Sequence, residues 1–517
     1  MINVLAERHT VETHAYVFIA SFCLMVIELV AGRIMAPYLG SSLYTWTSVI
    51  GVVLVGIALG NYTGGVLAER GASWRSVAFI YTFAGFAAAL SHYTYAPTMD
   101  LIQALNLPMQ AATVFFVVVG FFPVSFMLSL ITPIVITLSL KSLEKTGTTV
   151  GKVYAVSTAA SIAGTFAAGF LLIPLIGVKT IVLSVSAILI LMGIVISRGG
   201  TTKELVVKAT LLLLLASFLT PKFCEKETAY YCLNLEYNIS ERGEGYRFVL
   251  DRLTHSYVFD NPQTLEYDYE AVYAVLTEYM SERLGDRRPL RTLNIGGGGY
   301  TMPRYISTTY PDASVDVVEI DPMVTEANTE FFDLNPAGQI RTYNQDARMF
   351  FAHGADGNRY DVIFGDAFND YSVPYHLTTV EFAELIRQQL TPDGIYALNT
   401  IDDLEDGRLM SSFVKTLSEV FPHVQVSSSG KDWLADGRNT FVILASQQPI
   451  DLAVWQTAAD VAYQSYLTQP APVLIENVKK LVPQEDVADL AARPGSVKLT
   501  DNYAPVDSMT APLFKRH

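Results

Sequence analysis

The feature that most constrains this chain is the uneven distribution of its charged residues. Of 50 acidic residues only 7 precede Pro221, and of 35 basic residues only 11 do. The first 220 residues consist mainly of apolar stretches, several of them about as long as the twenty residues that a bilayer-spanning helix requires. This half therefore predicts an α-helical polytopic membrane domain. The acidic remainder is long enough for a soluble domain with its own core.

We expect about seven membrane spans in the apolar half. They are placed at roughly 15–36, 46–68, 75–96, 111–140, 154–176, 178–197 and 205–220. The fourth is long and contains Pro123 and Pro133, which can kink or break a membrane helix. A re-entrant pair at this place would raise the number of spans to eight.

Basic residues in the short loops indicate the orientation of the spans. The loops after the second, fourth and sixth spans contain Arg70, Arg75, Lys141, Lys145, Lys152, Arg198 and Lys203. Because cytoplasmic loops carry the excess of Lys and Arg, the N-terminus is expected inside. Seven spans then put the soluble domain on the extracytoplasmic side. There, Cys224 and Cys232 could form a disulfide or remain free thiols.

The soluble part alternates predicted strands and helices. Strands are expected at 230–239, 246–250, 292–295, 315–320, 340–343, 360–364, 395–400, 424–427 and 440–445, and helices at 267–284, 322–333, 346–353, 378–390 and 407–420. A turn is expected at 391–394. This alternation predicts an α/β Rossmann-like domain with a small N-terminal β piece and a mostly parallel sheet, whose ligands bind at the carboxyl ends of the strands.

Residues 291–321 carry the strongest functional signal. One predicted strand ends in four glycines, 296–299, and the next ends in Glu319 and Asp321. A glycine turn followed about twenty residues later by an acid at a strand end is typical of a nucleoside site, and a tight structural turn is the alternative. Asp346 and Asp366 follow two further strands, so several acids gather at one edge of the sheet. The acidic composition argues against nucleic-acid binding.

Several motifs together resemble the spermidine synthase (polyamine aminopropyltransferase) family, which has a fold of the S-adenosylmethionine-dependent methyltransferase type. The resemblance covers roughly residues 230–445. It rests on LDRLTHS (250–256), GGGG (296–299), VVEID (317–321), QDAR (345–348) and YDVIFGDAF (360–368). ELVAGRIMAPYLG (28–40) and LTDNYAPVDSM (499–509) resemble a bacterial subgroup in which this domain is fused to membrane helices. A multi-pass protein of the bacterial cytoplasmic (inner) membrane is therefore expected.

The resemblance implies how an adenosyl donor would bind. Glycines would lie along its methionine and ribose part, an acid would bind the ribose hydroxyls, and an apolar side chain would pack on the adenine. A further acid and the backbone after it would recognise the adenine amino group. The glycines are Gly296, Gly297 and Gly298. Glu319 would bind the ribose hydroxyls and Ile320 would pack on the adenine. Asp346 and the backbone of Ala347 would recognise the adenine amino group. S-adenosylmethionine or its decarboxylated form would be a substrate that yields 5'-methylthioadenosine, and neither a permanent cofactor nor a metal is expected.

The resemblance also implies a catalytic residue. Asp366 matches the acid that begins the family's catalytic loop, where it would orient an attacking amine and accept its proton. A helix N-cap is the alternative role for this residue. The residues expected to contact the acceptor amine are Tyr267, Tyr269, Asn369 and Asp370.

Three positions depart from the family pattern. Gly299 stands where the family has an Asp that binds the donor's amino group, Asn369 stands in place of a second acid, and His255 replaces a Gln. Fewer carboxylates weaken the hold on a dicationic diamine. The freed amine of the donor could instead attack its own propyl carbon, giving a four-membered ring and 5'-methylthioadenosine without an acceptor. His255 could act as a base in that reaction or could be a hydrogen-bonded wall residue.

Two other functions stay open at this stage. The domain could bind an adenosyl ligand without turnover and act as a sensor for a transporter-like membrane domain, or it could be a methyltransferase. A homodimer is also open, and the lipid bilayer is an expected partner. The expected domains are 1–220 (membrane), 221–265 (linker and small β subdomain), 266–450 (nucleoside-binding catalytic domain) and 451–517 (helical extension and tail).

Overall fold

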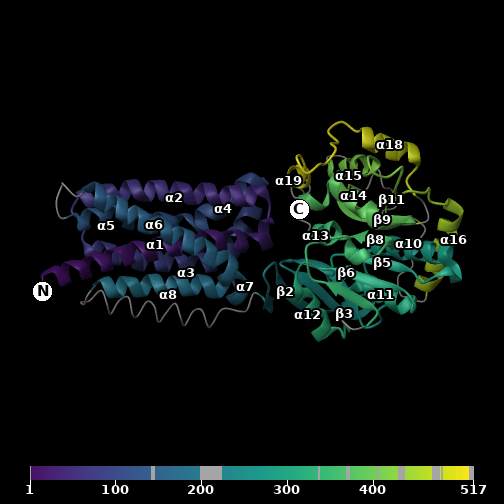
Figure 1. Cartoon of the computed structure of the whole chain (residues 1–517), viewed down its shortest axis with the longest axis horizontal. Coiled ribbons are helices and arrows are strands. Elements are labelled where there is room, and N and C mark those ends of the chain that lie inside the picture. Colours follow the sequence, from purple (N-terminus) through teal and green to yellow (C-terminus); the bar gives the residue numbers. More distant parts are fainter. Residues whose placement is uncertain are drawn as a thin grey trace. The chain divides into compact units, whose positions relative to one another are not determined.

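The computed structural model describes residues 2–140, 146–197, 224–240, 242–335, 338–367, 373–403, 407–428, 437–467, 478 and 481–511. The chain divides into two compact units, Met1–Tyr231 and Cys232–His517. The first unit is helical and the second is built around a β-sheet (Figure 1).

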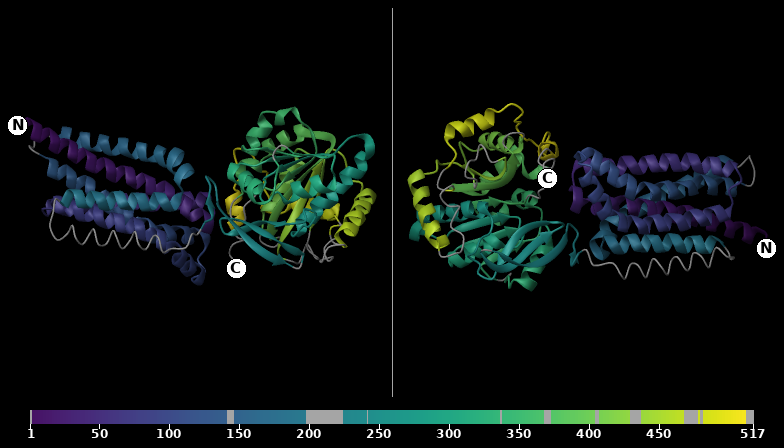
Figure 2. Two further views of the ribbon diagram at one scale, coloured as in Figure 1. Left: turned by 90° about the horizontal axis from the view of Figure 1, so that it is seen from below. Right: turned by 180° about the vertical axis from the view of Figure 1, so that it is seen from behind.

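The N-terminal unit is a bundle of long helices that run roughly side by side (Figures 1 and 2). Its described elements are α1 (Ile2–Leu39), α2 (Leu43–Glu69), α3 (Trp74–Ala104), α4 (Met109–Gly120), α5 (Phe122–Ser139), α6 (Thr146–Ala167), the π-helix η2 (Ala168–Leu172), α7 (Ile173–Ile176), α8 (Val178–Ser197) and the short strand β1 (Lys226–Glu227). Helix α2 packs on α5, α3 on α8 and α1 on α6. Glycine permits the closest of these approaches: a Cβ atom on Gly60 would lie 2.5 Å from the carbonyl oxygen of Phe126.

Five helical segments in the described part of the chain are long and apolar enough to cross a membrane. They are Glu12–Leu39, Leu43–Glu69, Phe122–Ser139, Thr146–Ile176 and Val178–Ser197. The predicted third span lies in α3, which is not among the five. The predicted fourth span is broken at Phe121 into α4 and α5, and Pro123 lies in the first turn of α5, where its missing N–H costs no helical hydrogen bond. The predicted span 205–220 lies outside the described residues, so the number seven stays a prediction.

A small antiparallel sheet opens the second unit. Strand β2 (Cys232–Ser240) pairs with β3 (Gly243–Leu250), which pairs with β4 (Leu253–Phe259). The first two strands were predicted, whereas β4, which contains much of the LDRLTHS motif, was not. Cys224 and Cys232 are disulfide-bonded, and Cys23 is a buried free thiol.

The large sheet has seven strands in the order β10-β11-β9-β8-β5-β6-β7. Strands β5 to β9 run parallel to one another, whereas β11 is antiparallel to both β9 and β10. The strands are β5 (Arg291–Ile295), β6 (Ser314–Val318), β7 (Ile340–Tyr343), β8 (Tyr360–Gly365), β9 (Leu390–Asp403), β10 (His423–Ser428) and β11 (Arg438–Ser446). The predicted Rossmann-like α/β fold with a mostly parallel sheet is confirmed.

Helices cover both faces of this sheet. They are α10 (Asp268–Leu284), α11 (Thr301–Thr309), α12 (Pro322–Phe331), α13 (Ala347–Ala352), α14 (Val380–Gln389), α15 (Leu409–Ser418), α16 (Leu452–Leu467), α18 (Gln484–Ala492) and α19 (Val506–Thr510), with single turns η3 (Gly285–Arg287), η4 (Ala355–Gly357) and η5 (Tyr375–Leu377). Ile363 belongs to the core cluster formed with α13, α14 and α15. Its neighbour Phe364 lies 4.6 Å from the ring of Tyr273 on α10. Because adjacent residues of a strand point to opposite faces, α10 covers the other face.

The predicted turn at 391–394 is part of strand β9 in the structure. Leu390 pairs with Tyr360, and the next pair is Ile395 with Val362, so four residues of β9 oppose a single residue of β8. This irregularity accommodates Pro392, whose ring removes one donor from the ladder. Strand β9 runs from Leu390 to Asp403 and so extends beyond both ends of the predicted strand 395–400.

Candidate active site

The glycine turn between β5 and α11 lies against neighbouring backbone. Gly296 has a φ of +93° and Gly298 a φ of +50°, a region that glycine enters at little cost. A Cβ atom on Gly296 would lie 2.6 Å from the carbonyl oxygen of Asp366. Position 296 therefore requires glycine both for its conformation and for its close approach to the loop after β8.

Glu319 lies directly beside this turn. Its side chain is buried, its Oε2 accepts a hydrogen bond from the amide of Gly297 at 2.7 Å, and its Oε1 accepts one from the amide of Asp321 at 2.8 Å. Burial raises the pKa of Glu319, and the amide donors oppose that shift. Asp321 instead caps α12 by accepting from the amide of Met323. Of the two acids after β6, Glu319 is therefore the one at the glycine turn, with Ile320 next to it.

Asp346 caps the next helix of the fold, α13. Its Oδ1 accepts a hydrogen bond from the amide of Met349 at 3.0 Å, and its Oδ2 lies 2.9 Å from Nε2 of His376 in η5. Ala347 begins α13 and is buried. His376 was not predicted, because nothing in the residues around it signals that it would meet Asp346.

Two motifs that are far apart in the sequence meet beside Asp346. Arg348, in the QDAR segment, binds both carboxylate oxygens of Asp501 in the LTDNYAPVDSM segment, and the hydroxyl of Thr379 donates to Asp501 at 2.8 Å. The bond to Arg348 is the main reason why the pKa of Asp501 is lowered. The C-terminal tail therefore helps to hold the start of α13.

Asp366 follows β8 and faces the α10 side of the sheet. Its Oδ1 accepts a hydrogen bond from Nδ2 of Asn399 on β9 at 2.9 Å, and it also accepts one from the hydroxyl of Tyr269. Burial raises the pKa of Asp366, while these two donors favour the carboxylate. Asn399 was not singled out from the sequence, although a polar residue at the end of an apolar strand is a usable signal. Asn369 and Asp370 lie outside the described residues.

A second buried acid stands at the start of α10. Glu270 accepts hydrogen bonds from the amides of Glu266 and Tyr267 at 3.0 and 2.9 Å. Burial raises the pKa of Glu270 to about 8, and the charge of Asp366 contributes to that rise. Glu270 is therefore protonated more readily than an exposed glutamate.

Comparison with known proteins identifies this domain. Residues 282–447 match the model of the spermine/spermidine synthase domain. The chain therefore carries a spermine/spermidine synthase domain. A polyamine aminopropyltransferase from Vibrio vulnificus is 28% identical over 250 residues, which cover 47% of this chain and 79% of that protein. The predicted family is confirmed for the soluble part, and the chain is an enzyme of the aminopropyltransferase-like transferase class.

Two further proteins are similar over parts of the chain. The human eEF1A lysine and N-terminal methyltransferase is 28% identical over 148 residues, which cover 27% of this chain and 21% of that protein. A solved structure of a probable spermidine synthase from Corynebacterium glutamicum is 26% identical and covers 55% of this chain and 99% of that one, with a TM-score of 0.46.

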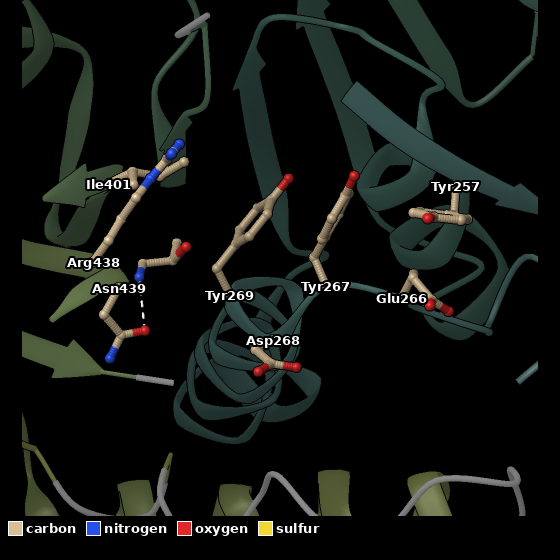
Figure 3. Close-up of a pocket in the computed structure, with 9 residues that line it drawn as sticks. Tyr257, Glu266, Tyr267, Asp268, Tyr269, Ile401, Arg438 and Asn439 are labelled. Carbon is tan, nitrogen blue, oxygen red and sulfur yellow. Dashed lines mark hydrogen bonds between the residues drawn. The ribbon is translucent and has the colours of Figure 1, made fainter. Parts of the chain in front are cut away.

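A cavity of about 500 Å³ lies beside Tyr269, between the start of α10 and the ends of β9 and β11 (Figure 3). It is lined by Tyr257, Glu266, Tyr267, Asp268, Tyr269, Ile401, Arg438, Asn439 and Thr440. The rings of Tyr267 and Tyr269 stack at 5.7 Å, and Tyr257 meets Tyr267 edge-on at 5.5 Å. Tyr269 also donates to Asp366, so one lining residue of the cavity contacts that carboxylate. Tyr267 and Tyr269, both predicted acceptor-binding residues, therefore belong to one wall of it.

Strand β4 closes the space beside Gly299. The amide of Gly299 donates to Oγ of Ser256 at 3.0 Å, and a Cβ atom on Gly299 would lie 2.4 Å from Cγ2 of Val258. At position 299, where the family has an Asp, the packing of β4 therefore leaves no room for a side chain. His255 is not among the described residues that line the cavity.

No group of three or more His, Cys, Asp or Glu side chains in the described part of the chain is arranged to hold a metal ion.

Proposed function

We propose that this protein is a membrane-bound enzyme of the spermidine synthase type. It would release 5'-methylthioadenosine by transferring to an amine either the aminopropyl group of decarboxylated S-adenosylmethionine or the aminocarboxypropyl group of S-adenosylmethionine itself. The observation that carries the proposal is the position of Asp366 at the end of β8. It is held by Asn399 and by Tyr269, and Tyr269 lines a cavity together with two further tyrosines.

The site residues supply positioning and a proton acceptor for this reaction. Glu319, beside the glycine turn, would bind the ribose hydroxyls, and Asp346 would recognise the adenine. The amine nitrogen attacks the propyl carbon next to the sulfonium, the carbon–sulfur bond breaks, and the bonding pair leaves with 5'-methylthioadenosine. Asp366 takes the proton that the amine loses. Its raised pKa makes it a stronger base than an exposed carboxylate.

A second candidate is the acceptor-independent cyclisation of the same donor. It is favoured by the packing of Ser256 and Val258 against Gly299, which excludes the carboxylate that would bind the donor's amino group. An unbound amino group could reach its own propyl carbon, closing a four-membered ring and releasing 5'-methylthioadenosine. Asp366 would again accept the proton.

The test is product analysis with the full-length protein in detergent. It is incubated with either donor, with and without 1,4-diaminobutane, and the products are identified by mass spectrometry. We expect 5'-methylthioadenosine together with an aminopropylated amine. Release of 5'-methylthioadenosine at an equal rate without any amine would replace transfer by cyclisation. Donor binding without turnover under all conditions would leave the sensor function instead.

We further propose that the protein is a multi-pass protein of the bacterial inner membrane, with its N-terminus inside and its soluble domain on the extracytoplasmic side. The disulfide between Cys224 and Cys232 supports an extracytoplasmic position of the soluble domain, because disulfides persist in oxidising compartments. We expect a protease added to spheroplasts to remove a C-terminal tag and to leave an N-terminal tag intact. Cleavage of the C-terminal tag only in inside-out vesicles would place the domain in the cytoplasm.

A further inference from the structure

The cavity lined by Tyr269 has a guanidinium group in its wall. Arg438 is the first residue of β11 and lines the cavity together with Ile401 and Thr440. In Figure 3 its side chain projects toward the same side as the hydroxyls of Tyr267 and Tyr269. A site built for a diamine would need negative groups here, since a second ammonium group would be repelled by an arginine.

Strand register places Arg438 on the same face of the sheet as the groups that hold Asp366. In the β11–β9 pair, Arg438 lies opposite Asp403 and Thr440 opposite Ile401. Opposed residues of an antiparallel pair share a face, as do alternate residues along one strand. Asn399, which binds Asp366, therefore belongs to the same face, and Arg438 stands about 13 Å further along it, at four residues of about 3.3 Å each.

The two ends of the cavity differ in charge. Glu266 and Asp268 line it beside the tyrosines, and both lie within 3.9 Å of guanidinium nitrogens of Arg242. Arg438 lies on the sheet side. A guanidinium has five N–H donors, so contact with a neighbouring side chain leaves donors for a ligand. Its planar pair of N–H donors matches the two oxygens of a carboxylate.

We propose that Arg438 binds a carboxylate of a reactant, so that the cavity accepts an amino carboxylate rather than a diamine. This inference rests on the proposed function. The carboxylate could belong to the donor, as in S-adenosylmethionine before decarboxylation, or to the amine acceptor. It takes no part in the bond changes: the amine still attacks the propyl carbon, 5'-methylthioadenosine still leaves, and Asp366 still takes the proton.

The experiment compares matched reactants on wild-type protein and Arg438→Gln. The donors are S-adenosylmethionine and its decarboxylated form, and the acceptors are 1,4-diaminobutane and 4-aminobutanoate, which have equally long carbon chains. We expect Arg438→Gln to lower kcat/KM about 30-fold for reactants that carry the carboxylate, in line with the loss of a charge-assisted hydrogen bond, and to spare the others. The control is Arg247→Gln, which removes a surface ion pair with Glu236 on the small sheet.

The outcomes separate this inference from the proposed function. If Arg438→Gln lowers kcat/KM only with S-adenosylmethionine, Arg438 binds the carboxylate of the donor. If it lowers kcat/KM only with 4-aminobutanoate, Arg438 binds the carboxylate of the acceptor. If the decarboxylated donor with 1,4-diaminobutane is the best pair and Arg438→Gln leaves its rate unchanged, the inference is overturned while the transferase function stands. If no pair reacts, equilibrium dialysis of the two donors and of the two amines decides. Equal loss of the ligands with and without a carboxylate, or no loss of any of them, in Arg438→Gln also overturns the inference.

Discussion

Replacing Asp366 by asparagine is expected to lower the rate of 5'-methylthioadenosine release by about a thousandfold, the usual contribution of a positioned general base. Asparagine keeps the size of the side chain and an oxygen that can accept from Asn399 and Tyr269. It cannot take the proton of the amine. The loss should therefore fall on kcat, with little change in donor affinity, and single-turnover kinetics measure the two separately.

The pH profile provides an independent check on this role. Because burial raises the pKa of Asp366, the base form appears at higher pH than for an exposed aspartate. The wild-type rate should therefore rise with pH through that raised pKa, whereas the residual rate of Asp366→Asn should lack this limb. The control is Asp393→Asn, an acid of the β9 irregularity that is paired with Arg283 away from the cavity. A residual rate in Asp366→Asn within tenfold of wild type would show that another group takes the proton.

Replacing Gly296 by alanine is expected to abolish donor binding. The new methyl group would lie 2.6 Å from the carbonyl oxygen of Asp366, in a residue whose φ is +93°. The conformation alone costs on the order of 1–3 kcal/mol, and the contact forces either the glycine turn or the loop after β8 to move. Since both carry site residues, donor binding measured by calorimetry should be lost even where the protein still folds.

Gly354→Ala is the matched control for that substitution. Gly354 also has a positive φ, of +82°, but a Cβ atom there would meet nothing within 4 Å. Gly354→Ala should lower the melting temperature without changing donor affinity. It shares the backbone strain of Gly296→Ala but not the close contact with a neighbouring backbone atom. If Gly296→Ala retained wild-type affinity, the turn would not be the donor site.

Part of this architecture follows from sequence because it depends on local patterns. The apolar stretches predicted a membrane domain, since a long apolar helix satisfies its own backbone groups within a bilayer. The glycine turn and the acid after β6 predicted a nucleoside site, and the structure brings Gly297 and Glu319 together through a direct hydrogen bond. Their roles with a bound donor stay predictions. Parallel strands place their carboxyl ends at one edge, so Asp346 and Asp366 could also be assigned to that edge from the strand pattern.

The tertiary structure decided which partners each of these residues has. The contacts of Asp366 with Asn399, of Asp346 with His376 and of Arg348 with Asp501 join segments about 30 to 150 residues apart in the chain. Arg438 reaches the cavity only because β11 runs antiparallel to β9 in one particular register. Local patterns reveal which face of a strand is buried, but pairing register and loop packing depend on the free energy of the whole fold. The sequence by itself therefore determined the two-part organisation, the glycine turn with its neighbouring acid and the family of the soluble domain, while the charge and the shape of the cavity were decided by tertiary packing.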